Sequence, residues 1–483
     1  MSPVRPLRST TATAAEIDAS LVDAALVDSQ LSVLWTDSED RPAVGAALDG
    51  DERADLVVVG AGYSGLWAAL HSLESEPSRS VVVIDSGPVA ARASGRNGGF
   101  VSASLTHGLA NGLDRFGSDI DRILAAGRAN FDGLVADVQR HRIDARLELT
   151  GALAVATEPW CVPVVRRDAD QAAAHGEDVE LFDADGIRAL VDSPTYHSGS
   201  WTRSGEALVD PARLGWGLAD AVRRAGGRIA EGTTMTGLVR HGAGVEVRTD
   251  RGRIRAQAVV LGTNAERSPV RAINRRIVPV YDHVLATEPL TDEQRASIGW
   301  RGRQGISDTT NQFHYYRLTD DGRILWGGYD AVFHNWGRTD ERFEDRPETF
   351  RTLAGNFLRT FPQLEGIRFS HRWAGVIDTS TRFSVGFGTA LDGRVAYAVG
   401  YTGLGVAASR FGGRVCVEML FAPEASALDL DLVRRAPIPF PPEPIRTAGI
   451  QLTRRAIARA DADGGRRGPW LRLLDRLGLG FDS

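Results

Sequence analysis

Residues 56–70 read LVVVGAGYSGLWAAL, and this stretch decides the fold. Four apolar residues at 56–59 precede glycines at 60, 62 and 65, and an apolar segment follows as far as residue 73. This order predicts a strand, a tight turn and a helix, and residues 81–84 predict a second strand. A unit of this kind begins a doubly wound parallel sheet.

The glycine spacing matches the turn that binds dinucleotides. Gly60 permits the tight turn, Gly62 lets a pyrophosphate approach the backbone, and Gly65 lets the helix pack closely on the strand. Asp85 ends the second strand, where a carboxylate accepts hydrogen bonds from ribose hydroxyls. We therefore predict a nucleotide site rather than a structural turn, with Tyr63 and Ser64 at the start of its helix. The spacing does not separate NAD from FAD.

The next segment, ASGRNGGF at 93–100, favours a flavin. Its three glycines allow close backbone approach, and Arg96 and Asn97 carry side chains that reach an electron-rich ring or a phosphate. An ordinary polar loop is the alternative, but the position just after the ribose carboxylate favours a cofactor contact. The predicted contacts in this segment are Ser94, Gly95, Arg96, Asn97, Gly98 and Gly99.

A third glycine-rich segment, VGYTGLGV at 399–406, again follows the pattern strand, turn and helix start. Free backbone N–H groups at a helix start stabilise negative charge, here at the pyrimidine end of a reduced flavin. A packing turn between helix and sheet is the alternative. The predicted contacts are Gly400, Thr402, Gly403, Leu404 and Gly405.

The composition excludes several classes of function. All 56 Lys+Arg residues are Arg, so the chain has no lysine for a pyridoxal Schiff base or a P-loop. The net charge of -6 argues against nucleic acid as a partner. Cys161 and Cys416 have neither a disulfide framework nor metal-ligand spacing. Residues 56–73 are uncharged, but their glycines and His71 favour strand, turn and helix over a membrane span.

The remaining pattern predicts two interleaved domains in an α/β chain, with an α+β second domain. Runs at 278–286, 313–318 and 323–326 predict an antiparallel sheet for the substrate, with a hairpin turn at 320–322. We assign 51–110, 201–268 and 371–436 to a Rossmann-like FAD-binding domain, and 111–200 and 269–370 to the substrate domain. Residues 1–50 are interpreted as an extension and 437–483 as a tail packed on the body. A cytoplasmic location is expected, because the first residues lack the apolar core of a secretory signal.

Five blocks resemble the D-amino-acid oxidase-like FAD oxidoreductases, most closely the gamma-glutamylputrescine oxidase branch, over roughly residues 30–420. They read VVVGAGYSGLWAAL, ASGRNGG, YYRLTDDGRILWGG, RWAGVID and GYTGLGVAASRFGGR. The resemblance implies oxidation of a carbon–nitrogen bond with the flavin as hydride acceptor, and reoxidation by O2 to hydrogen peroxide. It also implies Met235 near the adenine and Thr263 and Asn264 along the cofactor. No cysteine matches a covalent flavin site, so noncovalent FAD is expected.

The chain also departs from the family pattern. Amino-acid oxidases usually place a carboxylate-binding arginine after a proline in the hairpin strand, whereas residues 315–319 read YYRLT. The substrate is therefore expected to be a small amine without a required α-carboxylate. A lysine over the flavin is absent, so that Arg96, a histidine or a water has to serve in O2 activation.

Candidate catalytic residues follow from strand alternation. Tyr315 and Tyr316 point to opposite faces of their strand, and we choose Tyr316, with His314 beside it and Arg96 as the third catalytic candidate. An aromatic pocket favours the neutral amine by desolvation, so no dedicated base is expected. Among histidines, 107, 283, 314 and 371 are those expected nearest the site. The predicted substrate contacts are His107, Arg317, Trp326 and Trp373.

Three other functions remain open at this point. A dehydrogenase passes its electrons to a protein or quinone instead of O2, and a flavin monooxygenase needs NAD(P)H, for which the chain shows no second fingerprint. A nucleotide sensor without catalysis is the third. The sequence does not indicate the oligomeric state.

Overall fold

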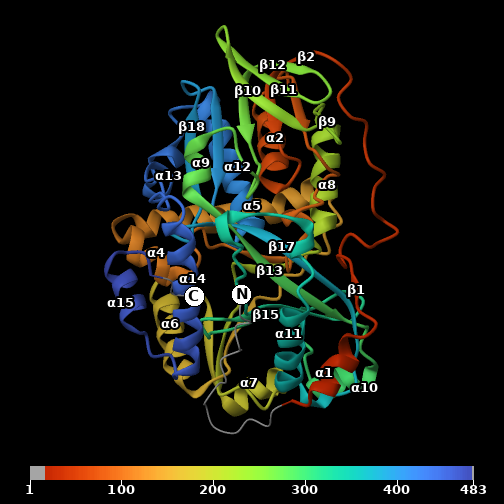
Figure 1. Ribbon diagram of the computed structural model, residues 1–483, viewed down its shortest axis with the longest axis vertical. Coiled ribbons are helices and arrows are strands. Elements are labelled where there is room, and N and C mark those ends of the chain that lie inside the picture. The colour runs from red at the N-terminus through yellow and green to blue at the C-terminus, as the bar shows by residue number, and fades with distance from the viewer. Residues whose placement is uncertain (1–16, 481–483) are drawn as a thin grey trace.

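The structure is a computed structural model, which describes residues 17–480. Figure 1 shows two halves, each built around one large sheet, with the chain passing between them several times. The upper half in this view holds an eight-stranded sheet and the lower half a nine-stranded sheet. The predicted α/β class is confirmed.

The eight-stranded sheet has a parallel centre, as the first strand–turn–helix unit predicts. β2 (Glu52–Val59) lies between β3 (Val81–Ile84) and β12 (Arg253–Leu261). β9 (Arg228–Ala230) and β19 (Val395–Val399) extend it in parallel on either side. Three antiparallel strands complete the sheet, namely β10 (Met235–His241), β11 (Gly244–Thr249) and β18 (Gly386–Ala390).

Both faces of these central strands are buried, which explains their unbroken apolar runs. Leu56 and Val58 of β2 pack under the helices, whereas Val57 and Val59 face a second cluster with strands β10 and β11. The helices on the first face are α2 (Tyr63–Ser75), α5 (Ile120–Arg140), α8 (Pro211–Arg224) and α12 (Gly405–Phe421).

The nine-stranded sheet contains the predicted hairpin. β15 (His314–Leu318) and β16 (Ile324–Gly328) pair antiparallel, and β16 pairs with β13 (Ile277–Thr287). Beyond β13 follow β17 (Phe369–Ser380) and β1 (Gln30–Leu31). On the other side of β15 lie β14 (Gly305–Asp308), β5 (Ala152–Ala156), β7 (Ser198–Thr202) and β6 (Val179–Asp183).

The two faces of the nine-stranded sheet differ in what covers them. Helix α11 (Pro347–Thr360), together with α1 (Ala19–Leu26), packs on one face and forms an apolar cluster there. We call this the α11 face. The opposite face, which we call the cavity face, turns toward the nucleotide-binding half, and Val284 and Ala286 of β13 join the core of that half. Alternate residues of each strand therefore have different surroundings.

Several shorter elements complete the two halves. The small ribbon β4 (Phe100–Ser102) and β8 (Glu206–Leu208) joins the second glycine segment to residues before α8. The remaining helices are α3 (Ala93–Arg96), α4 (Leu109–Phe116), α6 (Val162–Ala174), α7 (Ala184–Leu190), α9 (Arg271–Arg276), α10 (Asp292–Ile298), α13 (Asp431–Arg434), α14 (Ile445–Ala462) and α15 (Pro469–Arg476).

The sheets shift some of the domain boundaries drawn from sequence. β17 belongs to the nine-stranded sheet, so 371–380 lie in the half built on that sheet, which we call the substrate half. Helix α5 packs against α12 in the half built on the eight-stranded sheet, which we call the nucleotide half. The described part of the extension spans both halves, because Val22 of α1 packs near α11 whereas Trp35 joins the core beside the second glycine segment. Helix α14 was not expected from sequence.

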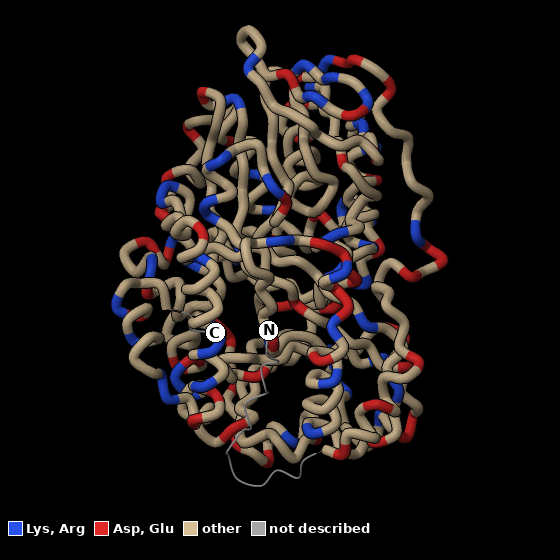
Figure 2. Tube along the Cα trace, viewed as in Figure 1, with Lys and Arg blue, Asp and Glu red and all other residues tan. Residues whose placement is uncertain are grey.

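Figure 2 shows acidic and basic residues interspersed along the trace. Over residues 17–480, no helix has the length and apolarity that crossing a membrane requires. Cys161 and Cys416 are buried free thiols, and the described residues contain no cluster of metal-ligating side chains.

Candidate active site

A cavity of about 1900 Å³ runs between the two halves. It starts at the carboxyl ends of β2 and β3, where ligands bind in doubly wound sheets, and passes over the cavity face of the nine-stranded sheet. Its far wall is formed by the C-terminal helices α14 and α15. All three glycine segments line it.

The first glycine segment has the geometry of a phosphate-binding turn. Gly60 has a φ of 109°, which favours glycine. A Cβ on Gly65 would lie 1.9 Å from the Gly60 carbonyl oxygen, so helix α2 approaches β2 only because this residue is glycine. The N-terminus of α2 therefore faces the cavity with its free N–H groups, which favour an anion.

Hydrogen bonds join the three glycine segments to one another. The Tyr63 backbone N–H donates to Ser94 Oγ at 2.9 Å, which ties the first segment to the second. Ser64 Oγ donates to the Tyr401 hydroxyl at 2.9 Å, which ties the first to the third. The structure thus brings together residues more than 300 positions apart in sequence.

Asp85 lies at the end of β3, as the fingerprint predicts. Its carboxylate accepts hydrogen bonds from the N–H groups of Ala61 at 2.7 Å and Gly87 at 2.9 Å, and it lines the cavity. Burial raises the pKa of Asp85 above its usual range. The carboxylate is therefore held at the turn where a ribose is expected.

The second glycine segment forms the short helix α3 and the loop after it. Arg96 forms an ion pair with Glu344 at 2.7 Å and donates to the Ala91 carbonyl. Asn97 holds the loop by accepting from the Gly99 N–H at 2.8 Å. A Cβ on Gly98 would lie 2.6 Å from the Tyr315 ring, so this loop approaches the cavity face closely.

The third glycine segment follows β19 and starts helix α12. Gly400, Thr402 and Gly403 all have positive φ, and Leu404 precedes the first helical residue, Gly405. The Gly400 N–H is not free as expected, because it donates to the carboxylate of buried Asp378 at 2.5 Å. Burial raises the pKa of Asp378 to about 7. The titratable carboxyl group of Asp378 thus lies at the third glycine segment, where the sequence predicted only backbone N–H groups beside a flavin.

The remaining predicted cofactor residues also line the cavity. Met235 begins β10, and Thr263 and Asn264 follow β12. Asn264 has a φ of 48° and donates to the Val376 carbonyl at 3.1 Å. Thr263 Oγ1 is buried without a hydrogen-bond partner in the described part of the chain. A buried hydroxyl of this kind calls for a polar ligand, and with the glycine turn and Asp85 it fits FAD.

The substrate end of the cavity contains a carboxylate that sequence analysis missed. Tyr315 donates its hydroxyl proton to Asp282 Oδ2 at 2.5 Å, and both residues line the cavity. Burial raises the pKa of Asp282 to about 6, although the Tyr315 hydrogen bond opposes the rise. No cation is paired with Asp282 among residues 17–480. Positions 278, 280, 282 and 284 share one strand face. The single acid among three valines on this face was the signal in the sequence that could have indicated a functional carboxylate.

The predicted catalytic pair lies on the other side of the sheet. Tyr316 is fully buried on the α11 face, and its hydroxyl lies 2.7 Å from that of Tyr196. His314 contacts Gly327 O at 3.3 Å and Asn356 Nδ2 at 3.0 Å. Trp326 packs between their rings at 4.4 and 4.6 Å. Strand alternation was applied correctly, but the face was chosen wrongly, so Tyr315 replaces Tyr316 at the cavity.

Arg317 and Trp373 do not line the cavity. They support the loop of the second glycine segment, which we call the cofactor loop. Arg317 is 1% exposed and donates to the Val209 carbonyl at 2.6 Å, directly beneath Gly99. Trp373 Nε1 donates to the Arg96 carbonyl at 2.8 Å. Because Arg317 is tied to backbone, it presents no cation for a substrate carboxylate.

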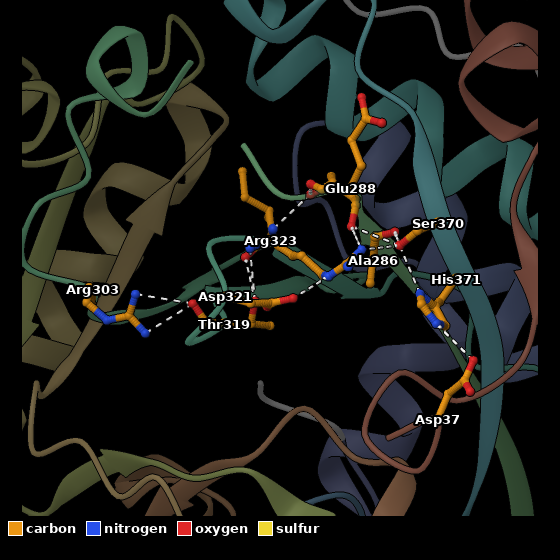
Figure 3. Close-up of polar contacts among 11 residues, drawn as sticks. Asp37, Ala286, Glu288, Arg303, Thr319, Asp321, Arg323, Ser370 and His371 are labelled. Carbon is orange, nitrogen blue, oxygen red and sulfur yellow. Dashed lines mark hydrogen bonds and ion pairs between the residues drawn. The ribbon is translucent and has the colours of Figure 1, made fainter. Parts of the chain in front are cut away.

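Of the four histidines, only His107 lines the cavity. It stacks on Phe383 with ring centroids 6.5 Å apart, and burial lowers its pKa to about 4. His283 lies on the α11 face against Phe350. His371 lies at the outer end of β17, where Figure 3 shows it between Ser370 and Asp37. His283 and His371 thus lie away from the cavity.

The C-terminal tail closes the far side of the cavity. Asp461 of α14 accepts from the backbone N–H groups of Asn311 at 3.0 Å and Gln312 at 2.8 Å. Arg454 forms an ion pair with Asp330 at 2.6 Å. These contacts fasten α14 to the substrate half, and its residues Ile450, Thr453 and Ile457 line the cavity.

Comparison with known proteins supports this geometry over most of the chain. Residues 55–419 match the family model "DAO: FAD dependent oxidoreductase". The chain is 31% identical to gamma-glutamylputrescine oxidoreductase of Escherichia coli strain K12, over 88% of this chain and 93% of that protein. It is 27% identical to a probable oxidoreductase, OrdL, of Haemophilus influenzae, over 76% of this chain and 83% of that protein.

Solved structures agree on the fold. Glycine oxidase from Geobacillus kaustophilus superposes with a TM-score of 0.67 at 18% identity, covering 80% of this chain and 99% of that one. L-proline dehydrogenase from P. horikoshii gives 0.62 at 19% identity, with coverages of 79% and 96%. The glycine-lined cavity and the family match lead to one assignment. The chain belongs to the DAO family of FAD-dependent oxidoreductases.

Proposed function

We propose that the protein oxidises the carbon–nitrogen bond of a small amine to an imine, which water hydrolyses, and that O2 takes up the electrons as hydrogen peroxide. The printed name of its Escherichia coli relative, a gamma-glutamylputrescine oxidoreductase, supports an amine. FAD, when bound, supplies the hydride acceptor. Binding is expected to be noncovalent, since both cysteines are buried and neither lines the cavity.

The observation that carries this proposal is the Asp282 carboxylate, which accepts a hydrogen bond from Tyr315 but has no counter-ion among residues 17–480. An ammonium group entering the cavity meets this acid, whereas the nearby guanidinium of Arg96 is already paired with Glu344. Arg317 is tied beneath the cofactor loop. The substrate end therefore offers an anion for an amine and no free arginine in these positions for a carboxylate.

Asp282 also provides a place for the proton that the amine must lose. The ammonium N–H bond breaks, its electron pair stays on nitrogen, and the proton forms an O–H bond on the carboxylate. Burial raises the pKa of Asp282 to about 6, so the carboxylate is ionised at neutral pH. This pKa is close enough to neutral pH for the carboxylate to accept a proton. Tyr315 orients the carboxylate through its hydroxyl.

Anaerobic flavin reduction tests the proposal. The purified holoprotein is mixed with polyamines, their acylated forms, N-methyl amino acids and D-amino acids, and loss of the oxidised flavin absorbance is followed. We expect amines without a carboxylate to reduce it, and peroxide to form in equal amount when air is admitted. Reduction by amino acids alone would contradict the amine assignment, and dye reduction without peroxide would identify a dehydrogenase.

A further inference from the structure

One arm of the cavity extends away from Asp282 along the ribbon β4–β8. Its wall is rich in hydroxyl groups from two strands and two loops. They come from Ser102 of β4, from Ser200 and Thr202 of β7, and from Ser104 and Ser204 in loops. A wall of this kind suits a polar group of a ligand rather than an apolar tail.

Glu206 is the acid of this arm. It stands opposite Ser102 in the β4–β8 register, and Ser102 Oγ donates to Glu206 Oε1 at 2.6 Å. Burial is the main cause that raises the pKa of Glu206 to about 8, and the nearby Glu177 carboxylate, which also lines the cavity, contributes to the same rise. Within the described range, Glu206 has no arginine or histidine partner. A half-buried carboxyl group thus faces the cavity without a counter-ion in the described part of the chain.

Ser200 gives an independent sign of a ligand. It is 7% exposed and lines the cavity, yet its hydroxyl has no hydrogen-bond partner among residues 17–480. Its hydroxyl is therefore available to form a hydrogen bond with a polar group of a ligand in this arm.

The arm is continuous with the substrate end. The Phe100 ring contacts the Tyr315 ring edge-on at 5.6 Å, and Tyr315 holds Asp282. Ser102 lies two residues beyond Phe100 on the same strand face, which is about 7 Å along the strand. Asp282 and Glu206 therefore stand at two separated points of one cavity, with aromatic side chains between them.

We propose that Glu206, with Ser102 and Ser200, binds a second cationic nitrogen of the substrate, remote from the carbon that is oxidised. This rests on the proposed function and extends it. The substrate is then an elongated amine with two nitrogen centres, one at Asp282 and one at Glu206. The aromatic stretch between them accommodates the connecting carbon chain.

Charge explains why the second group is a cation. Two carboxyl groups, of Glu206 and Glu177, face the arm, and the basic residues whose charges act on Glu177 are Arg128, which also lines the cavity, and His175. An anion would meet both acids, whereas an ammonium group would ionise Glu206 and pair with it. Binding near neutral pH should therefore release a proton from Glu206.

Calorimetry on the holoprotein tests this, with the flavin chemically reduced so that the amine is not consumed. The ligands are α,ω-diamines of increasing length and the n-alkylamines of equal length. We expect the best diamine to bind the wild-type protein about tenfold more tightly than its monoamine, with release of a proton measured in buffers of different ionisation enthalpy. Glu206→Gln should remove both the advantage and the proton, and leave monoamine affinity within about twofold.

Two further variants sharpen the test. Ser200→Ala should weaken only the diamine, by about threefold. Glu180→Gln changes an exposed acid that pairs with Arg203 outside the cavity, and should change neither ligand. Equal loss for diamine and monoamine in Glu206→Gln, or no preference in the wild type, overturns the inference. Failure of every amine to reduce the oxidised flavin would instead overturn the proposed function.

Discussion

The two faces of the nine-stranded sheet show how one strand can separate chemistry from stability. On the cavity face, Tyr315 contacts Asp282, which has no counter-ion in the part of the chain that the structure describes. On the α11 face, its neighbour Tyr316 meets another tyrosine inside an aromatic cluster. Residue type alone does not tell these two tyrosines apart. The difference comes from what packs over each face, and each prediction below tests that division.

The largest effect is expected from Trp326→Ala on the α11 face. Trp326 is 1% exposed and packs against Tyr316, His314 and Phe357. Its removal should cost about 3–5 kcal/mol of unfolding free energy, because a large cavity is left. Urea unfolding of the holoprotein measures this. In the folded fraction kcat/KM should stay within about threefold of wild type. A much greater loss of activity would contradict the division of roles, in which the cavity face serves activity and the α11 face serves stability.

Asp282→Asn on the cavity face should lower the activity and not the stability. We expect kcat/KM for the best amine to fall about 100-fold at pH 8, since the variant neither attracts the ammonium nor accepts its proton. In the wild type, kcat/KM should rise with pH through about 6, where Asp282 ionises. Stopped-flow flavin reduction across pH measures both. A profile unchanged by the substitution would show that Asp282 takes no part.

The same substitution should stabilise the fold. The pKa of Asp282 is raised from 3.8 to about 6 in the folded protein, so folding favours the protonated form. Its contribution to stability is present at low pH and is lost as pH rises through about 6. Asp282→Asn should therefore be more stable than wild type at pH 8, by up to about 3 kcal/mol, and nearly equal at pH 4. Equal stabilities at both pH values would contradict this burial cost.

The nucleotide half could be predicted from local sequence because its function is carried by backbone. Gly60 and Gly65 fix a turn whose geometry depends on few other residues, and Asp85 follows at a set spacing. The hairpin of β15 and β16 was predictable for the same reason, since its turn and its apolar runs are contiguous. Helix α14 was missed, because it is held by contacts with distant residues such as Asn311.

The substrate end depends on long-range packing and was less accessible. Alternation showed that Tyr315 and Tyr316 diverge, but choosing the face required knowing that α11 covers one side. Arg317 shares the face of Tyr315, yet it is removed from the cavity by the Val209 carbonyl, more than 100 positions away in sequence. No local pattern contains such information.

A matched pair of tyrosine variants should give smaller effects, one on activity and the other on stability. Tyr315→Phe removes the hydroxyl that orients Asp282, and kcat/KM should fall about tenfold with little change in stability. Tyr316→Phe leaves the Tyr196 hydroxyl unpaired in the core and should cost about 1–2 kcal/mol of unfolding free energy, with activity unchanged. Both variants lose one oxygen atom, so each is the control for the other. Similar losses of activity in the two would place both faces in the chemistry.

The smallest effect is expected for His314→Phe, which keeps the stacking on Trp326 and Tyr329. Burial lowers the pKa of His314 to about 3, so the ring is neutral throughout the working range. Its folded pKa lies below the unfolded value, so wild-type stability from this group is lost as pH falls from about 6.5 toward 3. The variant should lose less stability on acidification, while kcat/KM at pH 8 stays within about twofold. A His314 ring that stays neutral on the α11 face cannot shift the pH, about 6, at which kcat/KM rises as Asp282 ionises. If this pH changed in the variant, the α11 face would have to be regarded as part of the active site.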